Sequence, residues 1–331
     1  MKMKIYKRTA VFMCCLFLCT LFIPIRTLAA GSIDLTHEVS LTVSYQDGTL
    51  SLSDAQIDLY QVAAVDEYGE LTSTDIFDRF HIDIRGKNDE AWRTLAFTLE
   101  GYILRDNISP FDSGKTNQAG LISFPSAQKK LIPGLYLVLG QRHTQNGYYY
   151  DMSPFLVMLP SLDQKTNTWS YHVTAEVKYD VDPVPDGPDT IEYEVLKVWK
   201  DGGYEHERPQ EITVQLLRNG EIYDTVTLND KCNWRYIWTD LDGNYKWTVV
   251  EKEQEKYTVE VVREGVTFAV INTYAKDIPD NEVPKEPASP SDGKLPQTGQ
   301  LWWPVPLLIA VGLLCIVIGL LRRRSASDEE K

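Results

Sequence analysis

Hydrophobic and polar residues alternate along much of the chain with the period of two that is typical of β-strands. The alternating segments are rich in β-branched and aromatic residues, which favour strands. We therefore predict strands at Ser40 to Tyr45, Ala55 to Val62, Gly134 to Leu139, Phe155 to Leu159 and Ser170 to Val177.

One segment has a different period. Apolar residues recur at helical spacing between Asp89 and Leu104, after the candidate caps Asn88 and Asp89. These apolar residues are Trp92, Leu95, Ala96, Leu99, Tyr102 and Ile103. The pattern predicts a single helix within a chain that is otherwise made of strands.

Two stretches lack apolar periodicity and divide the chain. Residues 180–190 are rich in Pro and Asp, and residues 275–294 carry four prolines. Such compositions favour extended connectors, and the second would reach about 60 Å at about 3.1 Å per residue. We predict a first domain at residues 31–179 and a second at residues 191–274, each large enough for a core of its own.

The N-terminal segment, residues 1–30, has three parts. A basic stretch is followed by an apolar run from Ala10 to about Ile25, and the segment closes on Ala29 and Ala30. This order is typical of a secretory signal peptide, which is removed from the mature protein. The alternative is an N-terminal membrane anchor, which is disfavoured because the apolar run is short and ends at a cleavage-like site.

A second apolar segment lies near the C-terminus, from Leu301 to Leu321. It opens with two tryptophans, which suit a membrane interface, and three arginines begin the tail at residues 322–331. Its length is sufficient for a transmembrane helix with a cytoplasmic tail. By itself, the segment is equally consistent with a permanent membrane anchor.

A short motif, LPQTG, directly precedes this apolar segment. It comprises Leu295, Pro296, Gln297, Thr298 and Gly299. The order of motif, apolar span and basic tail resembles the sorting signal of Gram-positive wall-anchored proteins. The resemblance implies that a sortase cleaves after Thr298 and transfers it to an amine on the cell-wall precursor or on another subunit. It also implies a secreted protein that passes through a membrane-held intermediate and ends on the peptidoglycan.

Three polar residues of the second domain lie on strand faces that are otherwise apolar. By alternation, Lys197 shares its strand face with Tyr193, Val195 and Trp199. Glu251 shares its face with Trp247 and Val249. Asn272 shares its face with Phe268, Val270 and Tyr274. The face opposite Glu251 carries Lys246, Thr248 and Lys252. A lysine, a glutamate and an asparagine thus occupy positions where the pattern favours apolar residues.

Burial would change the ionisation of these groups. A low dielectric lowers the pKa of Lys197 and raises the pKa of Glu251. A neutral amine can attack the side-chain carbonyl of Asn272 while the acid moves protons, and loss of ammonia leaves an isopeptide bond. The pattern alone leaves two alternatives open: a buried ion pair of Lys197 and Glu251 capped by Asn272, and loop exposure that parity misses.

Four segments of the second domain carry a family resemblance. They are LKVWKD at residues 196–201, RPQEITVQLLRNG at 208–220, WTVVE at 247–251 and VINTY at 270–274. In this order they resemble a collagen-adhesin B-type (Cna-B) domain over residues 191–274. The resemblance implies an Ig-like β-sandwich in which Lys197 on the first strand is joined to Asn272 on the last strand, with Glu251 as the catalyst.

Composition adds two constraints. The formal net charge is −14, and both terminal segments carry more basic than acidic residues, so the mature chain is more acidic still. Such a charge argues against binding of nucleic acid. Of the five cysteines, Cys232 alone lies outside the two terminal segments, so an internal disulfide is excluded from the predicted mature chain. Pairing of Cys232 with His206 as a nucleophile is conceivable, but an incidental thiol is the simpler interpretation.

The first domain carries a less specific resemblance, to the N-terminal domain of pilus subunits. It rests on IPGLYLV at residues 132–138 and on TNQAGLISF at residues 116–124. The resemblance implies that Lys178 is the amine to which a pilus sortase joins the next subunit, although the proline of the family motif is missing. A solvated lysine at a strand end is the alternative.

An internal cross-link of the Cna-B type is not expected in the first domain. Residues 32–45 contain no lysine, and residues 170–177 contain no asparagine. The tyrosines at residues 148–150 are interpreted as a hairpin edge that packs its rings, with a binding surface as the alternative.

These observations predict an all-β chain with two Ig-like β-sandwich domains in tandem, the first with one helix inserted. The function expected is that of a structural, wall-anchored surface protein, a minor or basal pilin subunit whose partners are a sortase, the cell-wall precursor and other pilins. A monomeric adhesin that binds a host or matrix ligand through residues 31–179 is the alternative. No cofactor, metal site or set of catalytic residues is expected. A tethered enzyme with its active site in the first domain is the least favoured alternative, and it rests on the four histidines of that domain.

Overall fold

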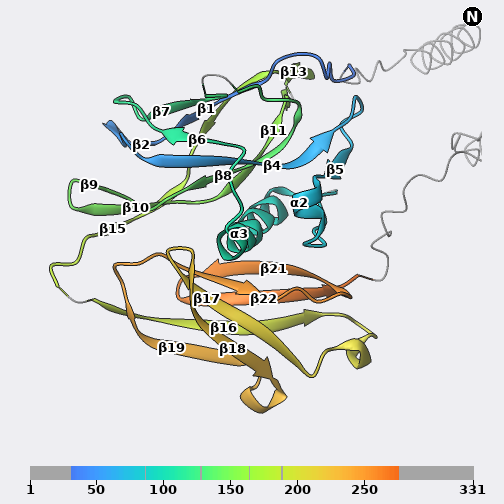
Figure 1. The fold of residues 1–331 in the computed structure, drawn as a ribbon, viewed down its shortest axis with the longest axis vertical. Helices are drawn as coiled ribbons and strands as arrows, with labels where there is room; N and C mark the ends of the chain where they lie inside the picture. Colours follow the sequence, from blue (N-terminus) through green and yellow to red (C-terminus); the bar gives the residue numbers. More distant parts are fainter. Residues whose placement is uncertain (1–30, 86, 127–128, 164, 188, 276–331) are drawn as a thin grey trace, which may run out of the picture. The chain divides into compact units, whose positions relative to one another are not determined.

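The computed structural model describes residues 31–275, except for residues 86, 127–128, 164 and 188. The predicted signal peptide, the LPQTG motif and the predicted transmembrane segment lie outside these residues. None of the helices in the described part of the chain is long and apolar enough to cross a membrane. The described residues belong to one compact unit (Figure 1).

Strands dominate the N-terminal β region, residues 31–183. They are β1 (Ser40–Ser44), β2 (Gln46–Asp47), β3 (Leu50–Ser51), β4 (Gln56–Val65), β5 (Leu71–Ser73), β6 (Asp112–Lys115), β7 (Leu121–Phe124), β8 (Gly134–Gly140), β9 (His143–Gln145), β10 (Tyr148–Met152), β11 (Phe155–Leu159), β12 (Ser161–Asp163), β13 (Thr168–Ser170), β14 (His172–Glu176) and β15 (Tyr179–Pro183). Its helices are α2 (Asp75–Asp78) and α3 (Asp89–Asp106). All five predicted strands are therefore found, as β1, β4, β8, β11 and β14.

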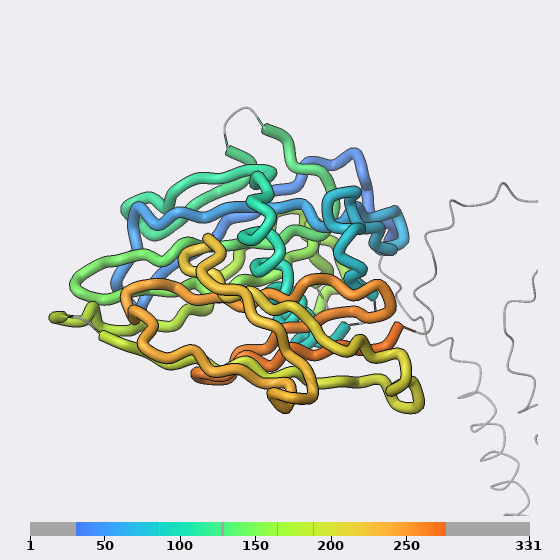
Figure 2. Tube along the Cα trace, turned by 60° about the horizontal axis from the view of Figure 1, so that its bottom comes forward, coloured from blue at the N-terminus to red at the C-terminus, as the bar shows by residue number. Residues whose placement is uncertain are grey.

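The C-terminal β region, residues 190–275, also consists mainly of strands. They are β16 (Thr190–Lys200), β17 (Glu211–Arg218), β18 (Glu221–Asn229), β19 (Arg235–Asp242), β20 (Trp247–Glu251), β21 (Tyr257–Glu264) and β22 (Thr267–Tyr274). Two short 3-10 helices, η1 (Glu205–Glu207) and η2 (Asp230–Cys232), lie between them. In Figure 2 the two regions are followed as the blue-to-green and the yellow-to-orange parts of the tube.

Two sheets of the N-terminal β region pack face to face. One has the order β14-β1-β7, and the other has the order β11-β8-β4-β5, with β6 also paired to β4. Alternate residues such as Leu41 from β1 and Leu59 from β4 meet in the core between them. The first strand, β1, pairs in parallel with β14, the last strand of its sheet in chain order.

Strand β8 is buried on both faces. Tyr136 and Val138 enter the core between the two sheets, whereas Leu135 and Leu137 enter a second core on the other side, against α3. A strand that is covered on both faces has a continuous apolar sequence, as GLYLVLG does.

Helix α3 begins where the sequence predicts and extends two residues beyond Leu104. The side chain of Asn88 accepts a hydrogen bond of 2.9 Å from the backbone N–H of Ala91, which is the usual role of an N-cap residue. Asn107, with a φ of 51°, ends the helix in the left-handed conformation.

The C-terminal β region is a sandwich of two sheets, with the orders β19-β16-β22-β21 and β18-β17-β20. Val195, Val214 and Phe268 are among the residues that fill the core between them. The first and last strands, β16 and β22, lie next to each other and run parallel. The prediction of an all-β fold with two sandwiches, the first with an inserted helix, is confirmed.

Three details differ from the sequence-based expectations. A second, short helix, α2, accompanies the single helix that was predicted. The connector predicted at residues 180–190 begins within a strand, because β15 (Tyr179–Pro183) pairs with β10. Strand β20 is buried on both faces, so Thr248 on the face opposite Glu251 is covered. Helix α3 covers this face, since Val250 of β20 packs in the same hydrophobic core as Leu99 of the helix.

Candidate functional site

The strands bring Lys197, Glu251 and Asn272 together inside the C-terminal sandwich. In the parallel pair of β16 and β22, Lys197 lies opposite Val270 and Asn272 lies opposite Trp199. Lys197 and Asn272 are thus diagonal neighbours on one face of the sheet. Glu251 ends β20 in the facing sheet, so the three side chains bridge the core.

The carboxyl group of Glu251 lies between the other two side chains. The Nζ of Lys197 donates a hydrogen bond of 2.9 Å to Oε2 of Glu251 and one of 3.3 Å to the carbonyl oxygen of Val270. The Nδ2 of Asn272 donates a hydrogen bond of 2.8 Å to Oε1 of the same carboxyl. One carboxyl group therefore links the amine to the amide through its two oxygens.

Water is excluded from this site. The side chains of Lys197 and Glu251 are 0% exposed, and Asn272 is also fully buried. Burial lowers the pKa of Lys197 to about 8, although the nearby Glu251 carboxyl acts in the opposite direction. Burial also raises the pKa of Glu251, against the opposing effects of Lys197 and Asn272. Both shifts favour a neutral amine beside a protonated acid.

The amide of Asn272 has one polar atom without a partner. Its Oδ1 is buried and accepts no hydrogen bond, which costs about 1 to 3 kcal/mol for such a group. A half-turn of the amide would bring Oδ1 to the Glu251 carboxyl, which could then donate to it only when protonated. Transfer of one proton from Lys197 to Glu251 would therefore have two effects. It would make the amine a nucleophile, and it would let the carboxyl polarise the Asn272 carbonyl.

The geometry bears on the alternatives that the sequence left open. All three residues lie in strands and are buried, so exposure in loops is wrong for them. A buried ion pair capped by Asn272 has the same contacts as the arrangement that precedes an amide exchange. The two differ only in whether one proton lies on Lys197 or on Glu251, and the contacts of the three side chains do not distinguish them.

Residues that sequence reasoning did not assign also surround the site. The ring centroid of Trp199 lies 4.6 Å from the Nζ of Lys197 and covers the amine. Asp201, which is buried, accepts hydrogen bonds of 2.6 and 2.7 Å from the guanidinium of Arg208, and this guanidinium lies 5.6 Å from the centroid of the Trp199 ring. Asp201 and Arg208 belong to the LKVWKD and RPQEITVQLLRNG segments that carry the family resemblance. Both residues were quoted there but were given no role at the site.

Lys178 lies apart from this site, in the N-terminal β region. It is exposed between β14 and β15, and its carbonyl oxygen accepts a hydrogen bond of 2.8 Å from the N–H of Ser153. It lines a groove of about 650 Å³. Apolar side chains dominate the rest of the lining: Leu71, Trp92, Leu135, Pro154, Phe155, Leu156 and Met158.

The tyrosines at residues 148–150 do not form one exposed surface. Tyr150 is buried in the core between the sheets, and Tyr148 is exposed. The hydroxyl of Tyr149 donates a hydrogen bond of 2.9 Å to Oδ1 of Asn244 in the C-terminal β region. The tyrosines do belong to a hairpin, since β9 and β10 pair antiparallel. Their strand is not an edge, however, because β15 pairs with the other side of β10.

Cys232 and His206 are not placed as a catalytic pair. The thiol of Cys232 donates to the carbonyl oxygen of Asn229, at 3.2 Å, within its own turn. His206 lies 3.6 Å from Glu207 and stacks on Tyr204. Among the described residues, no group of three or more His, Cys, Asp or Glu side chains is placed to hold a metal ion.

Comparisons with known proteins found one curated relative over a short range and solved structures that align over most of the chain. The collagen adhesin of Staphylococcus aureus is 32% identical over 80 residues, which is 22% of this chain and 7% of the adhesin. Two B repeat units of the collagen-binding protein of the same organism align over 72% of this chain and 49% of theirs, with 20% identity and a TM-score of 0.23. The full-length major pilin SpaD of Corynebacterium diphtheriae aligns over 73% of this chain and 65% of its own, with 12% identity and a TM-score of 0.28.

A family match covers the region that holds the buried site. Residues 193–273 match the Cna protein B-type domain, and this range contains Lys197, Glu251 and Asn272. The match extends from β16 to β22 and so includes both facing sheets. The C-terminal β region of this chain is a Cna protein B-type domain.

Proposed function

We propose that this chain is a structural cell-surface protein whose Cna protein B-type domain is closed by an isopeptide bond between Lys197 and Asn272. The observation that carries the proposal is the Glu251 carboxyl, buried and hydrogen-bonded to both the amine and the amide. The LPQTG motif supports the further proposal that a sortase joins Thr298 to the cell wall, with a pilin or an adhesin as the kind of protein.

The chemical step exchanges one amide for another. A half-turn of the Asn272 amide first brings Oδ1 to the Glu251 carboxyl. The neutral Nζ of Lys197 then attacks the side-chain carbonyl carbon, and the protonated Glu251 stabilises the negative charge that develops on Oδ1. In the tetrahedral intermediate the carboxyl delivers its proton to Nδ2 and takes one from the attacking nitrogen, and the bond between the carbon and Nδ2 breaks. One ammonia leaves, so the step needs no oxidant, reductant or cofactor.

The position of the bond gives it a mechanical role. Because β16 and β22 are the first and last strands of the domain and run parallel, tension on the chain ends pulls them in opposite directions. A bond between Lys197 and Asn272 would carry this tension directly from one strand to the other. The residues between them, which form most of the sandwich, would then bear no load.

We expect the rate of ammonia loss to show a bell-shaped dependence on pH. The reactive form of the Lys197–Glu251 pair holds one proton, on the acid, so the rate follows the population of the singly protonated pair. The acidic limb should lie above pH 4.5, since burial raises the pKa of Glu251 from that value. The alkaline limb should lie near pH 8, the lowered pKa of Lys197, because above it the pair loses its last proton.

The profile is measured by following the intact mass of the chain after dilution from denaturant into buffers of different pH. Each molecule that reacts becomes lighter by one ammonia. A rate that rises steadily with pH through the alkaline range would contradict this assignment, because it would show that the proton on Glu251 is not needed.

We also expect Lys178 to be the acceptor amine in a polymer of subunits. The side chain is exposed and lines the apolar groove, so an extended segment of a second chain can approach it. Lys178→Ala should abolish the detergent-resistant ladder of high molecular weight in cell-wall extracts. Lys165→Ala, which changes another exposed lysine of the same region, should leave the ladder unchanged.

The same extracts test the second candidate function, a monomeric adhesin. The groove of about 650 Å³ in the N-terminal β region favours it, because aromatic and aliphatic side chains line a space open to a ligand. A single wall-linked band that is the same in Lys178→Ala and in the unchanged chain would exclude the acceptor role and support the adhesin.

A further inference from the structure

We propose that helix α3, which precedes the Cna protein B-type domain in the chain, is a positioning element for the Lys197–Asn272 bond and that Gly101 and Thr98 are its positioning residues. The inference rests on the proposed cross-link. It adds that the bond forms efficiently only after the N-terminal β region has folded and docked α3 on the domain.

Two edge strands of the sandwich meet α3. Strand β20 ends the sheet β18-β17-β20, and β21 ends the facing sheet β19-β16-β22-β21. An edge strand has backbone groups without partners in its own sheet. The backbone N–H of Val261 on β21 donates a hydrogen bond of 2.9 Å to Oγ1 of Thr98, so the helix supplies the partner that the sheet lacks. In Figure 1, α3 lies beside β21.

Gly101 permits a close approach of α3 to β20. A Cβ atom added at Gly101 would lie 3.3 Å from the carbonyl oxygen of Val249 and 3.3 Å from the Cβ of Val250. Both distances are shorter than ordinary van der Waals contact. A side chain at this position therefore requires the helix and the strand that carries Glu251 to separate by at least a few tenths of an ångström.

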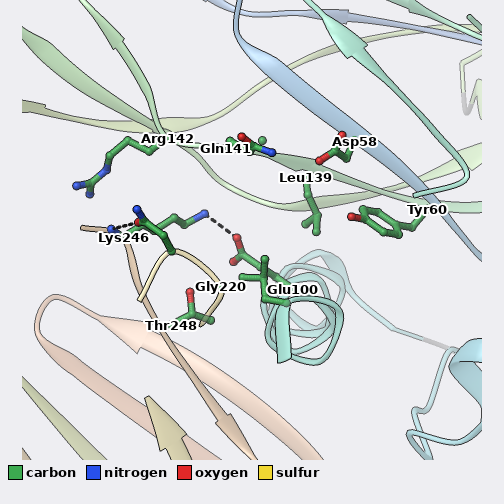
Figure 3. A pocket seen from close by; sticks show the side chains of 12 residues that line it. Asp58, Tyr60, Glu100, Leu139, Gln141, Arg142, Gly220, Lys246 and Thr248 are labelled. Atoms are coloured by element: carbon green, nitrogen blue, oxygen red, sulfur yellow. Dashed lines mark hydrogen bonds and ion pairs between the residues drawn. The ribbon is translucent and has the colours of Figure 1, made fainter. Parts of the chain in front are cut away.

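Ion pairs hold the helix at both ends of β20. Just before the strand, the Nζ of Lys246 donates a hydrogen bond of 2.6 Å to Oε1 of Glu100, and both side chains are largely buried. Figure 3 shows this pair beside a pocket of about 300 Å³. Just after the strand, Arg105 of α3 pairs with Glu253. The contacts of Glu100, Gly101 and Arg105 follow β20 in order, so the helix lies along the strand.

This arrangement keeps Glu251 dry. The inner face of β20 points into the sandwich, and its outer face would be open to water if α3 were absent, because Val250 packs in the same core as the helix. Water at β20 would stabilise the carboxylate and the ammonium of the pair. The reactive form, in which both groups are neutral, would then be less populated.

The charged and titratable groups that face Glu251 come from several elements. Lys197 on β16 is the closest cation, and Glu253, beyond the end of β20, opposes ionisation of Glu251. On α3, burial is the main cause that raises the pKa of the Tyr102 phenol, and the charges of Glu253 and Glu251 raise it further. Arg105 neutralises Glu253 by direct pairing. Displacement of α3 therefore changes both the hydration and the charge around Glu251.

The test compares rates of ammonia loss in full-length chains diluted from denaturant, over a range of pH. Gly101→Leu should lower the maximum rate at least about tenfold, which corresponds to one unit of pKa difference within the pair. The acidic limb of the profile should move to lower pH and the alkaline limb to higher pH, because both groups become better hydrated. Arg93→Ala, an exposed change on the same helix, should leave rate and limbs unchanged.

Two milder variants keep the test decisive if Gly101→Leu does not fold. Gly101→Ala favours the helix itself by about 1 kcal/mol, so a slower reaction in this variant would report the contact with β20 and not loss of the helix. Thr98→Val keeps the shape of the side chain and removes the partner of Val261. Both should change the rate and the limbs in the same direction as Gly101→Leu, by smaller amounts.

The outcomes separate this inference from the cross-link itself. An unchanged chain that never loses ammonia would overturn the proposed bond. If the unchanged chain reacts and folded Gly101 variants react at the same rate, the role of α3 is overturned. It is also overturned if the rate falls while both limbs stay in place, because loss of folded protein alone would have that effect.

Discussion

Glu251→Gln is expected to stop formation of the isopeptide bond. The amide that replaces the carboxyl keeps nearly the same shape, but it cannot carry a proton between the Lys197 amine and the Asn272 amide, the two groups that Glu251 contacts at 2.9 and 2.8 Å. Positioned acid–base groups contribute about 10² to 10⁴ in rate, so the variant should retain its ammonia for at least a hundredfold longer. Intact mass spectrometry of the folded chain measures the effect.

A control variant separates this effect from a general loss of negative charge. Glu221→Gln removes an exposed carboxylate from β18 of the same domain and should lose ammonia as the unchanged chain does. Complete loss of ammonia from Glu251→Gln at the normal rate would remove Glu251 from the mechanism. The bond would then form without the carboxyl, and the contacts of Glu251 with Lys197 and Asn272 would be structural only.

A large effect on stability and on mechanical unfolding should accompany the loss of the bond. A link between Lys197 and Asn272 closes a loop of about 75 residues, for which the chain-entropy relation gives about 4 to 5 kcal/mol of the free energy of unfolding. Under tension, the same residues are released only when the bond is absent, which adds about 250 Å of extended chain. We expect a pulled chain to show this extra step in Glu251→Gln and not in the cross-linked protein.

The unchanged sequence provides its own control for the mechanical experiment. A chain refolded and kept below the acidic limb of the rate profile should remain unreacted, and it retains every native side chain. It should release the same extra length as Glu251→Gln. If the reacted and unreacted chains release equal lengths, the bond does not link the first and last strands.

The candidate site could be predicted because it depends on local alternation. Lys197, Glu251 and Asn272 each occur among apolar residues of the same parity, and in a strand that parity alone determines which side of the sheet a residue faces. The start of α3 could be predicted for the same reason, since Asn88 caps a helix through a contact three residues away.

The surroundings of the site could not be predicted in this way. Parity assigned Thr248 to the face opposite Glu251, but it could not show that α3 covers this face. Tyr149 and Tyr150 are neighbours with the same chemistry, yet one bonds to Asn244 and the other fills a core. These differences depend on which other part of the chain lies against each face.

The sequence by itself therefore determined the strands, the helix and the polar residues that point inward, because these follow from contacts between near neighbours in the chain. The tertiary structure decided that the Glu251 carboxyl meets both the Lys197 amine and the Asn272 amide, and that α3 closes the edge beside it. The reason is physical: a carboxyl becomes dry, and its pKa rises, only when distant segments exclude water from every side. Packing between residues far apart in the chain decides this.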